Sequence, residues 1–123
     1  MNLVDSSGWL EYFTEGANVS FFASQIETPE TLLVPTICIY EVSKRLIREL
    51  GVRNADAAFA VMSEGCVIGL TPGLAMAAAE VSLATKLGMA DSIILATARY
   101  FGATVWTQDS DFEGLEGVMY TPK

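Results

Sequence analysis

Residues 90–112 read ADSIILATARYFGATVWTQDSDF. Apolar residues recur with the helical period through the first half of this segment, Gly102 interrupts the pattern, and the β-branched and aromatic residues of 103–107 predict a buried strand. Two acids, Asp109 and Asp111, follow this strand almost at once. A helix that leads through a glycine into a short apolar strand is typical of an α/β protein.

The same alternation extends through the rest of the chain. We expect strands at 2–4, 31–34, 66–70, 103–107 and, as a short fifth, 118–120. We expect helices at 8–13, 19–26, 37–50, 54–63, 72–87 and 90–101. Strands separated by helices indicate a central parallel sheet of four or five strands with helices on both faces. Because 123 residues is the length of one domain, we predict a single α/β domain over residues 1–123.

Charge and composition exclude several kinds of chemistry. Fifteen Asp and Glu against seven Lys and Arg give a net charge of −8, which on bulk charge alone argues against nucleic-acid binding. The sequence has no histidine, so Ser-His-Asp catalysis, Cys-His catalysis and histidine-bound zinc are all excluded. The chemistry that remains uses carboxylates, hydroxyls, lysine or a metal bound by oxygen ligands.

Nothing in the sequence indicates export or membrane insertion. No apolar segment approaches the roughly 20 residues that a membrane span requires. The first residues lack the basic segment of a signal peptide. Two cysteines, Cys38 and Cys66, are too few for a disulfide framework. We therefore expect a cytoplasmic protein that does not contact a membrane.

Five acids fall at or near the predicted carboxyl ends of strands, where open parallel sheets bind ligands. Asp5 closes the first strand, and Asp109 and Asp111 follow the fourth. Glu41 lies one turn into the helix after the second strand, and Asp91 begins the helical face that should meet the sheet. Each acid also has an ordinary explanation as a cap, turn or surface residue. However, crowded carboxylates cannot all stay ionised without a cation, and an all-oxygen cluster favours Mg²⁺ or Mn²⁺.

Glu41 is predicted to lie opposite the stripe of its helix that faces the core. That stripe comprises Ile39, Val42, Ser43, Leu46 and Leu50. An exposed ion pair between Glu41 and Arg45, one helical turn apart, is the simplest interpretation of the polar face. Yet Lys44, Arg45, Arg48 and Arg53 are four of only seven basic residues. They form the one basic patch that could meet a phosphate backbone, with Lys44, Arg45 and Arg48 as the candidate phosphate-binding residues.

Four fragments, in this order and spacing, resemble the PIN domains, and specifically the VapC-type toxins of bacterial and archaeal toxin–antitoxin pairs. The fragments are Leu3-Val4-Asp5-Ser6-Ser7, Tyr40-Glu41-Val42, Ala90-Asp91-Ser92-Ile93-Ile94-Leu95-Ala96-Thr97-Ala98 and Thr107-Gln108-Asp109-Ser110-Asp111-Phe112. The resemblance covers essentially the whole chain.

This resemblance implies a metal-dependent ribonuclease, usually an endonuclease, that is toxic until a small antitoxin covers it. Family members are typically homodimers, and their antitoxins typically bind DNA. Gly8 and Ser92 depart from the family pattern, which commonly has a bulkier aliphatic residue and an alanine there. By position, the implied acidic quartet is Asp5, Glu41, Asp91 and Asp109, with Asp111 as an additional acid and Ser6 and Thr107 as hydroxyls beside the metal.

We therefore predict hydrolysis of RNA phosphodiester bonds by one or two Mg²⁺ or Mn²⁺ ions held among Asp5, Asp91, Asp109 and, partly through water, Glu41. An alternative is a catalytically inactive PIN-like protein that dimerises and binds a basic peptide partner, since an acidic pocket also accepts Arg or Lys side chains. Metal affinity distinguishes the two hypotheses. A phosphoacceptor receiver domain is disfavoured, because its site needs a lysine after the last core strand and the chain has only the terminal Lys123 there.

Overall fold

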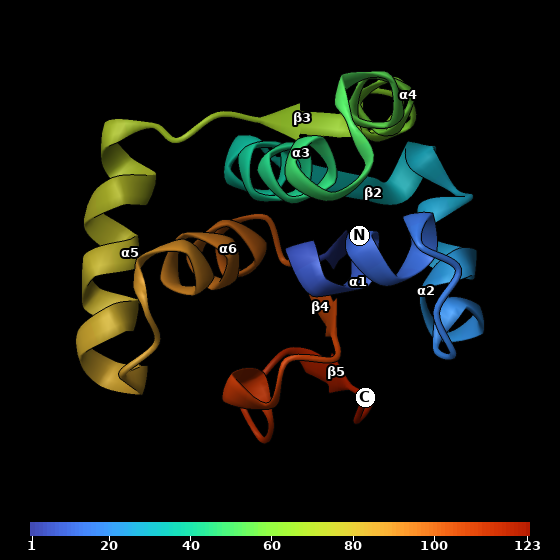
Figure 1. Cartoon of the computed structure of the whole chain (residues 1–123). Coiled ribbons are helices and arrows are strands. Elements are labelled where there is room, and N and C mark those ends of the chain that lie inside the picture. The colour runs from blue at the N-terminus through green and yellow to red at the C-terminus, as the bar shows by residue number, and fades with distance from the viewer.

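The computed structural model describes all residues from 1 to 123, and its elements alternate as predicted (Figure 1). The strands are β1 (Asn2–Val4), β2 (Leu32–Pro35), β3 (Cys66–Ile68), β4 (Thr104–Thr107) and β5 (Val118–Tyr120). The α-helices are α1 (Ser6–Phe13), α2 (Val19–Ile26), α3 (Thr36–Leu50), α4 (Val52–Met62), α5 (Pro72–Thr85) and α6 (Met89–Tyr100). Two short 3-10 helices are η1 (Pro29–Thr31) and η2 (Ser110–Phe112).

All five strands form one parallel sheet in the order β3-β2-β1-β4-β5, which confirms the predicted fold class. The chain moves outward from β1 through β2 to β3 and then crosses back, so that β4 pairs with the other side of β1. β1 and β4 therefore flank the point where the strand order reverses. In open α/β sheets, ligands bind beyond the carboxyl ends of the strands at this point.

Helices cover both faces of the sheet. Leu3 and Val4 of β1 are both fully buried, although successive side chains of a strand point to opposite faces. All four residues of β2 are buried as well. Helix α4 packs on α3, and α5 packs on α6 at the outer edge of the molecule, on the left of the view in Figure 1. The central strands β1 and β2 thus read as short apolar runs because neither of their faces meets water, whereas the edge strands β3 and β5 are partly exposed.

Gly8 lets α1 approach the core closely. A Cβ atom at this position would lie 2.6 Å from side-chain atoms of both Phe22 and Val4, which are fully buried. Real Cβ contacts are never this short, so any larger residue would push α1 away from β1 and α2. The departure from the family pattern at Gly8 is therefore matched by close packing against Phe22.

The predicted core stripe of α3 is correct in its middle and wrong at its end. Val42 and Leu46 are buried, but Leu50 is 50% exposed. Leu50 is the last residue of α3 and lines an open pocket rather than the core. At the other end of the helix, the fully buried residue is Cys38, which was not in the predicted stripe.

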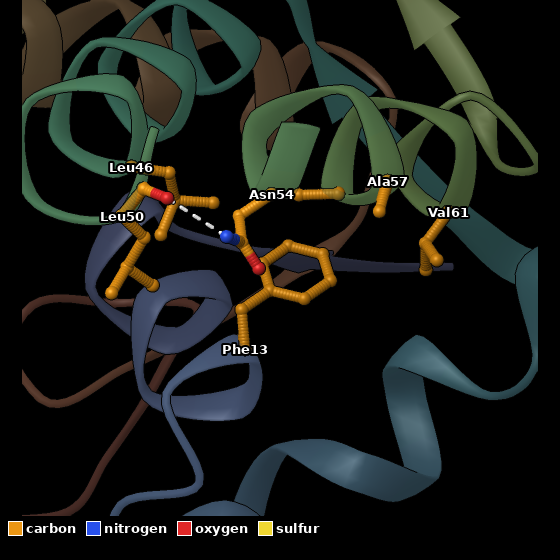
Figure 2. Close-up of a pocket in the computed structure, with 7 residues that line it drawn as sticks. Phe13, Leu46, Leu50, Asn54, Ala57 and Val61 are labelled. Carbon is orange, nitrogen blue, oxygen red and sulfur yellow. Dashed lines mark hydrogen bonds between the residues drawn. The ribbon is translucent and has the colours of Figure 1, made fainter. Parts of the chain in front are cut away.

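The turn between α3 and α4 shapes that pocket. Gly51 joins the two helices with a φ of +89°, and Asn54 Nδ2 donates a hydrogen bond of 2.8 Å to the carbonyl oxygen of Leu50 (Figure 2). The pocket has a volume of about 230 Å³ and is lined by Phe13, Leu46, Leu50, Asn54, Ala57, Ala58 and Val61. None of the five predicted site acids lines it, so this apolar pocket lies apart from the candidate site.

The junction of α5 and α6 differs from the prediction. Helix α5 ends at Thr85 because Lys86 adopts a left-handed φ of 66° and caps the helix. The helix expected over 72–87 is therefore two residues shorter, and Gly88 is the N-cap of α6. No single helix is long and apolar enough to cross a membrane; α5 and α6 meet that test only when taken together, and they are bent by 112° at their junction.

Candidate metal centre

The site is built around the adjacent carboxyl ends of β1 and β4. Asp5 follows β1 and caps α1, since its Oδ1 accepts hydrogen bonds from Gly8 N at 3.0 Å and from Ser7 Oγ at 2.7 Å. Thr107, the last residue of β4, donates its hydroxyl to the other oxygen, Oδ2, at 2.6 Å. The carboxylate of Asp5 is therefore both a helix cap and the link between two strands.

Asp5 is almost inaccessible to solvent, with 2% of its surface exposed. Burial raises the pKa of Asp5 to about 6, because it disfavours the charged form. The hydrogen bonds from Thr107, Ser7 and Gly8 act in the opposite direction, and the nearby Asp109 raises the pKa further. A buried carboxylate with a raised pKa is typical of a functional site rather than of a simple cap.

Asp91 lies in the first turn of α6, and its half-buried carboxyl group faces the other acids. Its pKa is raised to about 7, first by burial and then by the charges of Asp109, Asp5, Glu41 and Asp111, in that order. The charges of all four other acids thus act on Asp91, although only Asp91, Asp109 and Asp111 place carboxylate oxygens within 4.8 Å of one another. Burial is the larger cause of the raised pKa of Asp91, and repulsion from the other carboxylates adds to it.

Asp109 and Asp111 complete the cluster from the loop after β4. Asp109 caps η2 by accepting a hydrogen bond of 2.9 Å from the backbone N–H of Asp111, so the turn interpretation of Asp109 is also correct. Carboxylate oxygens of Asp91, Asp109 and Asp111 all lie within 4.8 Å of one another. These three acids can offer one ligand atom each to a single ion.

Glu41 reaches the site from α3. Ser6 Oγ, at the start of α1, donates a hydrogen bond of 2.6 Å to Glu41 Oε1. The predicted ion pair between Glu41 and Arg45 does not form, because Arg45 instead pairs with Glu49 at 2.7 Å. Glu41 is half-buried and faces α1, so its side of α3 is turned toward the site rather than toward open solvent.

Two residues near the acids were missed by the sequence analysis. Ser7 holds Asp5 as described above and accepts a hydrogen bond of 3.3 Å from Gln108 N. Cys38 lies fully buried beneath the site; burial raises the pKa of its thiol, and so do the charges of Asp5 and Glu41. A hydroxyl two residues after a strand-end acid is the signal that could have identified Ser7.

The candidate phosphate-binding residues form a border to the acidic cluster. A shallow pocket of about 220 Å³ is lined by Tyr40, Glu41, Lys44, Arg45 and Arg48. Arg48 lies 3.8 Å from Glu49, the residue that also binds Arg45, whereas Lys44 forms no ion pair. The structure therefore places the basic side chains directly beside Glu41, where they can meet an anion bound at the site.

The donor set fits a hard divalent cation. None of the five acids forms an ion pair with a Lys or Arg side chain, although four of them raise the pKa of the fifth, Asp91. All available ligand atoms are carboxylate or hydroxyl oxygens, because the site contains no histidine and its one thiol is fully buried. Such a set suits Mg²⁺ or Mn²⁺ better than a softer metal.

The protein is an α/β domain whose five-stranded parallel sheet carries an acidic site. The carboxylates of this site gather where the strand order of the sheet reverses, and its ligand atoms are all oxygens. The profile of the PIN domain family matches residues 3–118, and the chain belongs to that family. The match includes all five acids of the cluster. A search of curated protein sequences found no significant match.

Several solved structures share the fold over nearly the whole chain. One is a chain of a toxin–antitoxin complex from Klebsiella pneumoniae, with 24% identity, a TM-score of 0.80 and coverage of 100% of this chain and 98% of that one. VapC20 of Mycobacterium tuberculosis, a toxin that cleaves the sarcin-ricin loop, has 21% identity, a TM-score of 0.80 and coverage of 96% and 97%. A chain of the DNA-bound VapBC complex of Salmonella typhimurium has 17% identity, a TM-score of 0.76 and coverage of 99% and 98%. At these identities the likeness establishes the fold alone.

Proposed function

We propose that this PIN domain is a metal-dependent ribonuclease, an endonuclease that hydrolyses RNA phosphodiester bonds and acts as the toxin of a toxin–antitoxin pair. The observation that carries the proposal is the group of five acids without a single basic partner; burial, together with the charges of the other four acids, raises the pKa of Asp91 to about 7. The fold shared with VapC20, a toxin that cleaves an RNA loop, supports the reaction class.

In this proposal, Asp5, Asp91 and Asp109 hold the metal, Glu41 contributes partly through water, and Asp111 is an additional ligand. When bound, Mg²⁺ or Mn²⁺ supplies a water of lowered pKa and polarises the scissile phosphate. A bound cation would also offset the charges of the neighbouring acids, which add to the effect of burial in raising the pKa of Asp91.

The hydroxyl groups of the chain orient these ligands. Thr107 and Ser7 donate to opposite oxygens of Asp5, which fixes the plane of that carboxylate. Ser6 holds Glu41 in the same way from the start of α1. Hydrogen bonds of this kind to metal ligands set their orientation and basicity. Ser6 and Thr107 thus act as supporting residues that do not need to touch the substrate.

Basic residues beside the cluster would bind the RNA backbone. Lys44, Arg45 and Arg48 lie at the border of the acids, where they can neutralise phosphates flanking the cut. This local arrangement answers the objection raised by the net charge of −8, because binding depends on where the charges lie as well as on their sum. Bound metal removes part of the negative charge at the site.

We further propose a cytoplasmic protein that forms a homodimer and is covered by a cognate antitoxin. The similar structures from Klebsiella pneumoniae and Salmonella typhimurium are a toxin–antitoxin complex and a DNA-bound VapBC complex, which supports an antitoxin partner here. Co-purification of this chain with the product of a neighbouring reading frame tests the antitoxin. Light scattering of the isolated chain tests the homodimer.

The alternative is a PIN domain without catalytic activity that uses the same acids to bind a basic peptide. The raised pKa of Asp91 favours any cation at this place, including an Arg or Lys side chain. Metal affinity separates the two, since a peptide-binding site has no need for a saturable divalent ion. We favour the ribonuclease because Asp91, Asp109 and Asp111 place carboxylate oxygens within 4.8 Å of one another, a separation that suits a single ion; Asp5 is not among these three.

Cleavage of total cellular RNA by purified protein in Mg²⁺, Mn²⁺ or EDTA tests the proposal. We expect discrete fragments with either metal, none in EDTA and none with Asp91→Asn. Asp56→Asn is the matched control, because Asp56 is an exposed acid of α4 outside the cluster, and it should cleave like the parent. Cleavage that persists in EDTA or in Asp91→Asn would refute the assigned site.

A further inference from the structure

Tyr40 presents an exposed aromatic ring next to the acidic centre. It directly precedes Glu41 in α3, and 58% of its surface is accessible. Its hydroxyl makes no hydrogen bond and its ring pairs with no other aromatic ring. By contrast, Tyr12 donates to Glu27 and the exposed Tyr100 packs edge-on against Phe101. Apart from Lys44, whose ammonium group lies over the ring, Tyr40 has no such partner, and the exposed ring remains accessible to a ligand.

Two surface pockets share the ring of Tyr40. The first is the shallow pocket that contains Glu41, on the side of the acids. The second has a volume of about 370 Å³ and is lined by Tyr40, Ser43, Lys44, Ile47 and Arg48. Tyr40, Lys44 and Arg48 belong to both pockets, and they lie four residues apart along one stripe of the helix. The stripe leads away from the acids along α3.

Charge makes this surface suitable for a nucleic acid. Lys44 Nζ lies 5.8 Å from the centre of the Tyr40 ring and forms no ion pair. Apart from Glu41, no acid lines either pocket. A cation without an acidic partner, lying over an exposed aromatic ring, is the combination that binds single-stranded nucleic acids.

We infer that Tyr40 stacks on an unpaired base of the RNA close to the scissile phosphate, while Lys44 binds the adjacent backbone. This inference rests on the proposed ribonuclease function and extends it: the substrate is single-stranded at the cut and lies along α3. Paired bases stack on each other inside a duplex and cannot cover the ring, so double-stranded RNA is excluded at this position. Tyr40 is a positioning residue, because it binds the substrate without touching the reacting atoms.

The test measures binding of a short single-stranded RNA that contains the fluorescent base 2-aminopurine. The protein carries Asp91→Asn, so that binding is measured without cleavage. We expect Tyr40→Ala to weaken binding about tenfold and to abolish the quenching of 2-aminopurine, in line with the loss of one stacked base. Tyr40→Phe and Tyr40→Trp should retain both signals, because they keep an aromatic face.

Tyr100→Ala is the matched control, since Tyr100 is 73% exposed and lies in α6. It should bind like the parent. The inference is overturned if Tyr40→Ala binds the single-stranded RNA and quenches 2-aminopurine as the parent does. It is also overturned if Tyr40→Ala weakens binding of a duplex of the same sequence to the same extent, or if the substitution affects only the binding of a protein partner. The assay needs no catalysis, so absence of cleavage by the unmodified chain would contradict the proposed function without altering this result.

Discussion

Thr107 Oγ1 donates a hydrogen bond of 2.6 Å to Asp5 Oδ2 and thereby joins the carboxyl ends of two neighbouring strands. The same hydroxyl oxygen accepts a hydrogen bond of 2.9 Å from the backbone N–H of Asp109. One fully buried side chain thus positions two acids that follow different strands. The geometry of the acidic cluster therefore depends on a residue that is not itself an acid.

Replacing Thr107 by Val should destabilise the fold and weaken the site. Valine keeps the shape but leaves the buried Asp5 Oδ2 and the part-buried N–H of Asp109 without their partner, which costs about 1–3 kcal/mol. Thr107→Ser retains the hydroxyl and serves as the control. Urea unfolding measures the difference between the two variants. Equal stability of Val and Ser at this position would show that the hydrogen bonds contribute nothing.

Loss of Ser6 should weaken metal binding without unfolding the chain. Ser6→Ala removes the 2.6 Å hydrogen bond that holds Glu41, and removal of such a supporting contact typically lowers metal affinity about 10–100-fold. Calorimetric titration with Mn²⁺ measures the change. Ser20→Ala, at an exposed serine near the start of α2, is the control and should bind like the parent. Unchanged affinity of Ser6→Ala would remove Glu41 from the metal site.

The raised pKa values predict an unusual dependence of stability on pH for the metal-free protein. In the folded chain Asp5 and Asp91 have pKa values of about 6 and about 7, against 3.8 for an ordinary Asp. Between these values the folded state binds more protons than the unfolded state, so stability falls as pH rises. This contribution is complete below the unfolded pKa and is lost as pH passes through 6 to 7.

Thermal unfolding in EDTA, from about pH 5 to about pH 8, measures this effect. The midpoint should fall more steeply for the parent than for Asp91→Asn, because asparagine does not titrate. Saturating Mg²⁺ should restore stability at the higher pH, since a cation compensates the ionised acids. A parent that behaves like Asp91→Asn over this range would mean that Asp91 is not under electrostatic strain.

Gly8 offers a test of the packing that holds α1 in place. Gly8→Ala puts a Cβ atom 2.6 Å from Phe22 and Val4 and should destabilise the chain by about 1–3 kcal/mol. Gly73→Ala is the matched control in α5, where an added Cβ meets nothing within 4 Å. There alanine should be neutral or stabilising by up to about 1 kcal/mol, because glycine weakens a helix. Urea unfolding compares the two; similar values would contradict the packing account.

Much of the fold and of the acidic cluster could be predicted from the sequence, for one physical reason. Short apolar strands that alternate with helices give a parallel sheet, and the carboxyl ends of parallel strands share an edge. Asp5 and Asp109 follow two strands, so their proximity depends only on those strands being neighbours. The pairing of β1 with β4 meets that condition.

The partner of Glu41 could not be predicted in the same way. Helical periodicity places Glu41 opposite the core stripe of α3, but it does not reveal which element packs on that side. In the structure α1 lies there and supplies Ser6, so a residue expected to pair with Arg45 faces the site instead. The prediction that Leu50 is buried was wrong for a related reason. The helical period of apolar residues extends to the end of α3, but the core does not reach that far.

The most direct test of the account is a calorimetric titration of the purified chain with Mg²⁺ and Mn²⁺, repeated with Asp91→Asn. We expect saturable binding of one or two ions per chain, and loss of that binding when the carboxyl group of Asp91, which lies near four other acids, becomes an amide. Absence of saturable binding, or equal binding by Asp91→Asn, would contradict the metal centre and favour the peptide-binding alternative.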